Sequence, residues 1–208
     1  MKKRILCFGD SNTWGFIPGV GDRYDEDTRW TGRLQTILGD DYAVVEEGMN
    51  GRTAAFLDFL EPWCIGIEYI APCLISQFPL DAIVIMLGTN DTKTRYGASA
   101  EEVGYGVSEL LHKIKYVCQK TGLERPATLI MAPPAIGDMD GDPEFGPDSI
   151  LKSRILGPIL AEKAEAHGCD FVDIAKIVTE VGVDNVHMTP EGHAKVAETV
   201  AEWVKKTI

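Results

Sequence analysis

Short apolar runs alternate with longer amphipathic segments along the whole chain, and this alternation restricts the fold more than any other feature. The run 83–87, IVIML, is apolar throughout, which is typical of a strand covered on both faces. Because a helical pattern follows each run, the strands are predicted to be parallel and joined by right-handed crossovers. The predicted strands are residues 3–8, 42–46, 81–87, 127–132 and 170–173.

The helical patterns have recognisable ends. Ser99 and Glu102 form a capping box, and Gly122 follows the end of the same segment. Thr189 and Pro190 are a capping residue and a first-turn proline. The predicted helices are residues 30–38, 66–77, 99–121, 149–168 and 190–206. The expected fold is α/β, with residues 1–208 forming a single domain around one parallel sheet.

Charge and cysteine usage restrict the partners and the compartment. The net charge of −12 disfavours nucleic acid and anionic membranes as partners, because both would be repelled. No apolar stretch is long enough to cross a membrane, and the apolar run near the N-terminus is too short for a signal peptide. The five cysteines are widely spread and form no C-x-x-C pair, which favours reduced thiols, a cytoplasmic location and no metal site.

Polar segments follow several of the predicted strands. In a parallel sheet, the loops after the strands meet at one edge, where ligands bind. These segments are Gly9–Asn12 after the first strand, residues 47–53 after the second, 87–92 after the third and 183–193 after the last. We therefore expect them to build one site.

Three side chains in these loops have the types needed for acyl transfer. Ser11 alone could be a turn residue, a phosphate-binding hydroxyl or a nucleophile. A nucleophilic serine needs a base, and His187 can supply it because histidine titrates near neutral pH. Asp184, three residues earlier, can orient the imidazole. The backbone N–H groups of Ser11 and Gly51 and the amide of Asn90 are candidate donors to the oxyanion.

In this order and spacing, the motifs resemble the SGNH (GDSL-type) hydrolase superfamily. The Gly-Asp-Ser block lies at residues 9–11, the second-block glycine is Gly51, the G-x-N-D asparagine is Asn90, and Asp-x-x-His falls on Asp184 and His187. The resemblance extends over essentially the whole chain. It implies a flavodoxin-like three-layer α/β/α sandwich with a five-stranded parallel sheet.

The segments ILCFGDSNTWG, RWTGRL, EEGMNGRT and IMLGTNDTK resemble the bacterial arylesterase/acyltransferase branch, typified by the mycobacterial acyltransferase. This branch implies a cofactor-free serine esterase that hydrolyses short-chain acyl esters, and some of its members also transfer acyl groups to alcohols. Its partners would be a small-molecule ester and further copies of the chain, with an octamer among the assemblies that the resemblance suggests. The alternative with the same triad is a carbohydrate O-deacetylase or a small thioesterase, to which Lys93, Arg95 and Tyr96 could contribute polar contacts.

One departure from the wider family is Asn12, where leucine is usual, and we expect this change to leave catalysis untouched. Further candidate substrate-binding residues are Asp10, Trp14 and Asn50, together with Asn12 itself. Asp10 and Asp91 have a simpler interpretation as carboxylates that fix loops by accepting backbone N–H bonds.

The remaining histidines and acidic residues are predicted to lie outside the chemistry. His193 is expected to be a packing or surface residue of the last helix, and His112 and His167 are expected to be solvated. The aspartate-rich segment 137–149 fails as a calcium loop, because Pro143 stands where such a loop needs glycine. Its twelfth position also holds a serine instead of a glutamate.

The first loop, taken alone, is also compatible with a different class of function. A flavodoxin-like binding module would use Ser11, Asn12 and Thr13 to hold a phosphate at the first strand–helix turn. That interpretation needs neither Asp184 nor His187, and the loop lacks a glycine-rich cradle. We therefore favour the hydrolase.

Overall fold

Five strands form one parallel sheet in the computed structural model, which describes residues 2–139 and 141–208. The strands are β1 (Lys3–Gly9), β2 (Tyr42–Gly48), β3 (Ala82–Met86), β4 (Ala127–Ala132) and β5 (Asp170–Asp173). Their order across the sheet is β2-β1-β3-β4-β5, and each neighbouring pair is parallel. The predicted five-stranded parallel sheet is confirmed.

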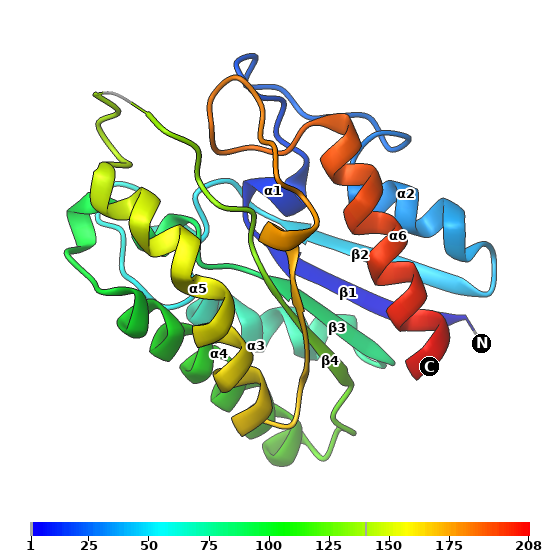
Figure 1. The fold of residues 1–208 in the computed structure, drawn as a ribbon. Coiled ribbons are helices and arrows are strands. Elements are labelled where there is room, and N and C mark those ends of the chain that lie inside the picture. Colours follow the sequence, from blue (N-terminus) through cyan, green and yellow to red (C-terminus); the bar gives the residue numbers. More distant parts are fainter. Residues whose placement is uncertain (1, 140) are drawn as a thin grey trace.

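Helices cover both faces of this sheet (Figure 1). On one face lie α3 (Gly66–Gln77), α4 (Ala100–Thr121) and α5 (Pro147–Ala166), and on the other lie α2 (Trp30–Leu38) and α6 (Pro190–Thr207). The shorter elements are α1 (Ser11–Trp14) and the 3₁₀ turns η1 (Pro62–Cys64), η2 (Asn90–Thr92), η3 (Thr94–Tyr96) and η4 (Ile174–Lys176). The three layers form the expected α/β/α sandwich.

The alternation of side chains along β3 divides the core into two halves. Ile83 and Ile85 pack into the cluster under α3, α4 and α5, while Val84 and Met86 pack into the cluster under α2 and α6. All five residues of β3 are buried. Burial of apolar surface on both faces of the strand explains why its sequence shows no polar alternation.

The predicted helix ends agree closely with the structure. The capping box of Ser99 and Glu102 is present at the start of α4, and Gly122 ends that helix in the left-handed conformation at φ 70°. Thr189 accepts the N–H of Gly192 at the start of α6. One difference is α5, which begins at Pro147, two residues earlier than predicted, because proline fits the first turn.

The connections bring distant loops to one edge of the sheet. The chain runs from β1 outward to β2 and then back across β1 to β3, so the strand order reverses between β1 and β3. The loops after these two strands carry Ser11 and Asn90. The segment between β5 and α6 returns across the same edge, where Val186 and Met188 bond to Asn12. Among the described residues, no helix has both the length and the apolar character needed to span a bilayer.

Candidate active site

Ser11, His187 and Asp184 form a continuous chain of hydrogen bonds. His187 Nδ1 lies 2.7 Å from Asp184 Oδ2, and His187 Nε2 lies 2.9 Å from Ser11 Oγ. Because a carboxylate only accepts, Nδ1 carries the proton and Nε2 accepts from the serine hydroxyl. The same carboxylate accepts the backbone N–H groups of Val186 and His187. Burial opposes ionisation of Asp184, but these hydrogen bonds outweigh it and lower its pKa to about 2.

Ser11 occupies the first position of α1, directly after the buried end of β1. Asp10 caps this short helix by accepting the N–H of Asn12 at 3.0 Å, and Gly15 closes it in the left-handed conformation. The side chain of Asp10 is fully buried, and this burial raises its pKa to about 6. Asp10 therefore holds the turn that presents Ser11, as the loop-fixing interpretation predicted.

Asn12 links this turn to the histidine loop. Its Oδ1 accepts the N–H of Met188 at 2.9 Å, and its Nδ2 donates to the carbonyl of Val186 at 3.4 Å. The side chain is buried and reaches both neighbours of His187. The leucine that is usual at this position could make neither bond, so the departure is a polar clamp between the two loops.

The three residues with candidate oxyanion donors, Ser11, Gly51 and Asn90, line the same cavity. Gly51 has φ +76°, a conformation that glycine adopts without strain. Asn90 Nδ2 donates one hydrogen to the carbonyl of Arg52 at 3.1 Å, which fixes the amide and leaves its second hydrogen available. Within the described part of the chain, the backbone N–H groups of Ser11 and Gly51 make no hydrogen bond.

Two buried charged residues, Arg52 and Asp91, hold the loops around the site together. Arg52 donates Nη1 to the carbonyls of Gly9 and Glu47, and its guanidinium lies 4.3 Å from the ring centroid of Phe8. It thereby ties the loop after β2 to the end of β1. Arg52 belongs to the segment EEGMNGRT, but the sequence did not indicate these contacts, because they depend on the folded path of the loop.

Asp91 accepts the N–H of Ala54 at 2.8 Å. It was expected to fix its own loop, and this bond instead holds the neighbouring 52–55 segment against η2. Complete burial, with a smaller contribution from the nearby carboxylate of Asp10, raises its pKa to about 7.

A cavity of about 230 Å³ opens over Ser11 and His187. Its lining includes three apolar residues, Phe16, Phe145 and Val186, and three charged residues, Glu61, Lys93 and Glu144. The remaining lining residues are Asn50, Gly51 and Asn90, in addition to Ser11 and His187.

Of the four candidate substrate-binding residues, the structure places only Asn50 in this lining. Asp10 and Asn12 are buried beneath it. Trp14 instead packs against the guanidinium of Arg23, 5.4 Å from its ring centroid.

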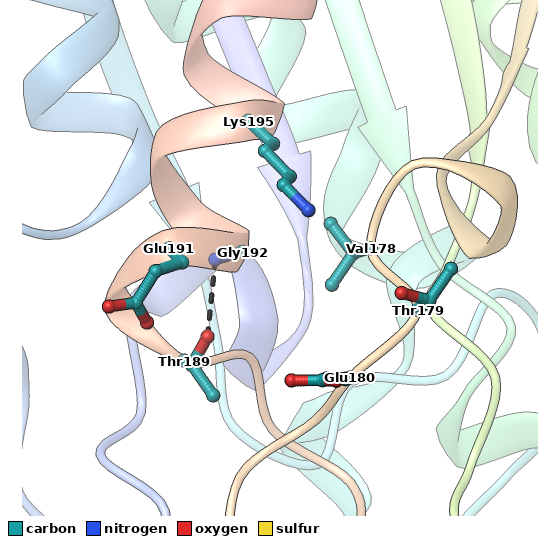
Figure 2. Close-up of a pocket in the computed structure, with 7 residues that line it drawn as sticks. All are labelled: Val178, Thr179, Glu180, Thr189, Glu191, Gly192 and Lys195. Carbon is teal, nitrogen blue, oxygen red and sulfur yellow. Dashed lines mark hydrogen bonds between the residues drawn. The ribbon is translucent and has the colours of Figure 1, made fainter.

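A second cavity, of about 340 Å³, lies beside the start of α6 (Figure 2). Its walls are residues 178–180, which precede the histidine loop, and part of the helix that follows it. The Thr189 hydroxyl already caps α6 by accepting the Gly192 N–H, as the dashed line in Figure 2 shows. None of the triad residues lines this cavity.

Among the described residues, none of the other three histidines makes a hydrogen bond to the triad. His193 is completely buried in α6, where its Nδ1 accepts the N–H of Trp30 at 3.2 Å, so the packing interpretation is confirmed. His112 is exposed, as expected. His167 is only half-exposed, because its Nε2 bonds to Ser108 at 2.8 Å, and the expectation of full solvation was wrong for it.

The acidic segment between β4 and α5 uses its carboxylates locally. Asp138 pairs with Arg154 at 2.7 Å, and Asp142 accepts the N–H groups of Glu144 and Phe145. Asp140 would be the third position of a calcium loop beginning at Asp138, and it lies outside the described residues.

The sequence matches the family model described as the GDSL-like lipase/acylhydrolase family over residues 7–195. Among curated proteins, an acetylxylan esterase from Xylanibacter ruminicola is 28% identical over 216 residues. The alignment covers 97% of this chain but 43% of the relative. The chain thus spans less than half the length of that protein.

Two solved structures are similar along their whole length. The aryl esterase of M. smegmatis has a TM-score of 0.91 and 32% sequence identity, with 99% of this chain and 100% of that chain covered. Est24, a carbohydrate acetylesterase from Sinorhizobium meliloti, has a TM-score of 0.94 and 31% identity, with 100% of both chains covered.

Proposed function

The chain belongs to the GDSL-like lipase/acylhydrolase family, and from this premise we propose that it is a serine esterase acting on short-chain acyl esters. The observation that carries the proposal is the hydrogen-bond chain from Asp184 through His187 to Ser11 at the floor of an open cavity. The similarity to an aryl esterase and to carbohydrate acetylesterases supports acetyl-type esters as substrates.

In the proposed mechanism, His187 Nε2 takes the proton of Ser11 as Oγ attacks the ester carbonyl carbon. Asp184 stays ionised at working pH and stabilises the imidazolium that forms. The N–H groups of Ser11 and Gly51 and the amide of Asn90 stabilise the oxyanion. His187 then protonates the departing alkoxide. The alcohol leaves, and the acyl group remains bound to Ser11.

The acyl-enzyme is resolved by the same groups. His187 deprotonates a water molecule, which attacks the acyl carbonyl, and the proton returns to Ser11 as the acid leaves. An alcohol that replaces water at this step gives a new ester, so we include acyl transfer in the proposal. The apolar lining residues Phe16, Phe145 and Val186 support acyl transfer, because an apolar lining favours an organic acceptor over water.

A carbohydrate O-deacetylase is the second candidate. Three charged lining residues, Glu61, Lys93 and Glu144, favour this candidate, because charged side chains can form hydrogen bonds with the hydroxyl groups of a sugar. Turnover of acetylated xylose compared with an aryl acetate separates the two candidates.

We also propose that the protein forms a homo-oligomer in the cytoplasm. Exposed apolar side chains beside the cavity support an assembly, because a large apolar patch marks an interaction surface. They are Leu57, Phe59, Leu60 and Trp63, with Phe59 85% exposed. The five cysteines are free thiols, which supports a reducing compartment.

The test is labelling with a serine-directed fluorophosphonate, followed by intact-protein mass spectrometry, with p-nitrophenyl acetate turnover measured in parallel. We expect one adduct and turnover in the wild type, and neither in Ser11→Ala. An adduct that persists in Ser11→Ala would move the nucleophile elsewhere. Absence of both adduct and turnover in the wild type would overturn the esterase.

A further inference from the structure

We propose that Glu61 selects the substrate by charge, favouring esters with a cationic alcohol part and disfavouring anionic ones. The proposal rests on the esterase function above and concerns the same cavity. Glu61 lies directly before η1 and lines the cavity together with Gly51 and Asn90.

The Glu61 carboxylate lies close to Gly51, one of the candidate oxyanion donors. A Cβ built on Gly51 would lie 2.6 Å from Glu61 Oε2, so the carboxylate lies against the Cα of this glycine. An alanine at position 51 would force the Glu61 carboxylate to shift. The close approach places a negative charge at the edge of the reacting centre, within reach of a bound ester.

The other charged residues of the lining, Lys93 and Glu144, belong to a network of ion pairs that continues behind the cavity. Lys93 Nζ lies 3.1 Å from Glu144 Oε2, and Arg95 Nη1 lies 2.6 Å from Glu144 Oε1. Arg95 Nη2 also pairs with Asp58 at 2.8 Å. Two cations and two carboxylates therefore balance in this network, and the Lys93 side chain is almost completely buried within it.

Glu61 is a fifth charge that the network does not balance. Across residues 2–139 and 141–208, its carboxylate makes neither an ion pair nor a hydrogen bond. The charged residues that line the cavity, Glu61, Lys93 and Glu144, consequently carry an excess of one negative charge. A substrate charge within a few ångströms of it changes binding by roughly tenfold in either direction when the surroundings are only partly solvated.

An acetyl group fills little of the cavity, so we expect the alcohol part of an acetyl ester to be the part that lies near Glu61. Three aryl acetates test the proposal: 4-nitrophenyl acetate, 4-(trimethylammonio)phenyl acetate and 4-acetoxybenzoate. The readout is the ratio of kcat/KM for the cationic ester to that for the anionic ester. Intrinsic reactivity cancels when this ratio is compared between variants.

We expect the wild-type ratio to fall by about tenfold or more in Glu61→Gln and in Glu61→Ala at low salt. Glu61→Asp should retain part of it, and added salt should reduce it because the cavity is open to solvent. The matched control is Glu202→Gln on the exposed side of α6, which makes the same change in net charge far from the cavity. It should leave the ratio within about twofold of the wild type.

The outcomes separate this inference from the function on which it rests. Turnover of 4-nitrophenyl acetate with a ratio that is unchanged in both Glu61→Gln and Glu61→Ala would overturn the role of Glu61 alone. An equal drop in Glu202→Gln would assign the selectivity to the overall charge of the protein. No turnover of any of the three esters would overturn the esterase itself.

Discussion

The ring of Phe16 lies against the imidazole of His187, with centroids 4.2 Å apart and planes inclined by 30°. Phe16 comes from the loop after α1, and its backbone N–H bonds to the carbonyl of Ser11. One aromatic ring thus restrains the proposed base from the side of the nucleophile. Its face also offers negative quadrupole charge to the imidazolium that forms during attack.

Replacement of Phe16 by alanine should reduce kcat by roughly fivefold to thirtyfold, the range of a cation–π contact of about 1–2 kcal/mol. Phe16→Trp should retain most of the rate, because it also offers an aromatic face. The check is the split between kcat and KM for p-nitrophenyl acetate. A change confined to KM would mean that Phe16 only shapes the cavity.

Asn12→Leu tests the polar clamp between the serine turn and the histidine loop. It leaves the buried N–H of Met188 and the carbonyl of Val186 without their partner, which costs about 1–3 kcal/mol of unfolding free energy. We expect a lower Tm and a kcat reduced by roughly tenfold, equivalent to about 1.4 kcal/mol. Urea denaturation and steady-state kinetics measure the two effects.

The matched control for that experiment is Thr13→Val. Within the described residues, the buried hydroxyl of Thr13 has no hydrogen-bond partner, so its loss should leave both stability and kcat nearly unchanged. An Asn12→Leu enzyme that matched wild type in both measurements would restore the sequence-based expectation that this departure is neutral.

The sequence predicted the approach of Ser11, Asp184 and His187, because the loops that follow parallel strands must meet at one edge. It predicted the ends of α4 and α6 for a similar reason, since the capping residues act locally. These features depend on chain direction and on neighbours within one turn. Both are visible in a linear sequence.

The contacts of Arg52, Phe16 and Glu61 could not be predicted in this way. Each lies in an irregular stretch, and its partner is set by the path of the loop. Arg52 reaches the carbonyl of Gly9, 43 residues earlier, and no local pattern encodes that distance. For Trp14 the sequence predicted a substrate contact, because this aromatic residue lies in a loop at the expected site. Its ring instead packs against Arg23 and does not line the cavity.

Asn90→Ala removes the one side-chain donor to the oxyanion in the proposed mechanism. Loss of a single donor costs roughly 10²–10³ in kcat, with the protein still folded. The comparison is Asn50→Ala, which removes an amide from the same cavity but no proposed oxyanion contact. It should act mainly on KM. Similar kcat losses in both variants would remove Asn90 from its assigned role.

The buried carboxylate of Asp91 should make the protein less stable as the pH rises. Burial moves its pKa from an ordinary 3.8 to about 7, so the folded state keeps a proton that the unfolded state has released. The free energy of unfolding should therefore fall as the pH rises from about 4 to about 7, and it should level off above about pH 7. From about pH 5 to about pH 8 the loss amounts to roughly 2 kcal/mol.

Asp91→Asn should remove most of this fall, because an amide oxygen can still accept the N–H of Ala54 but does not ionise. Asp10, with its pKa raised to about 6, contributes in the same direction and stays in the variant. The measurement is urea denaturation at several pH values, with the exposed Asp41→Asn as the control. A pH slope equal in wild type and Asp91→Asn would show that Asp91 is already ionised in the folded protein at about pH 5.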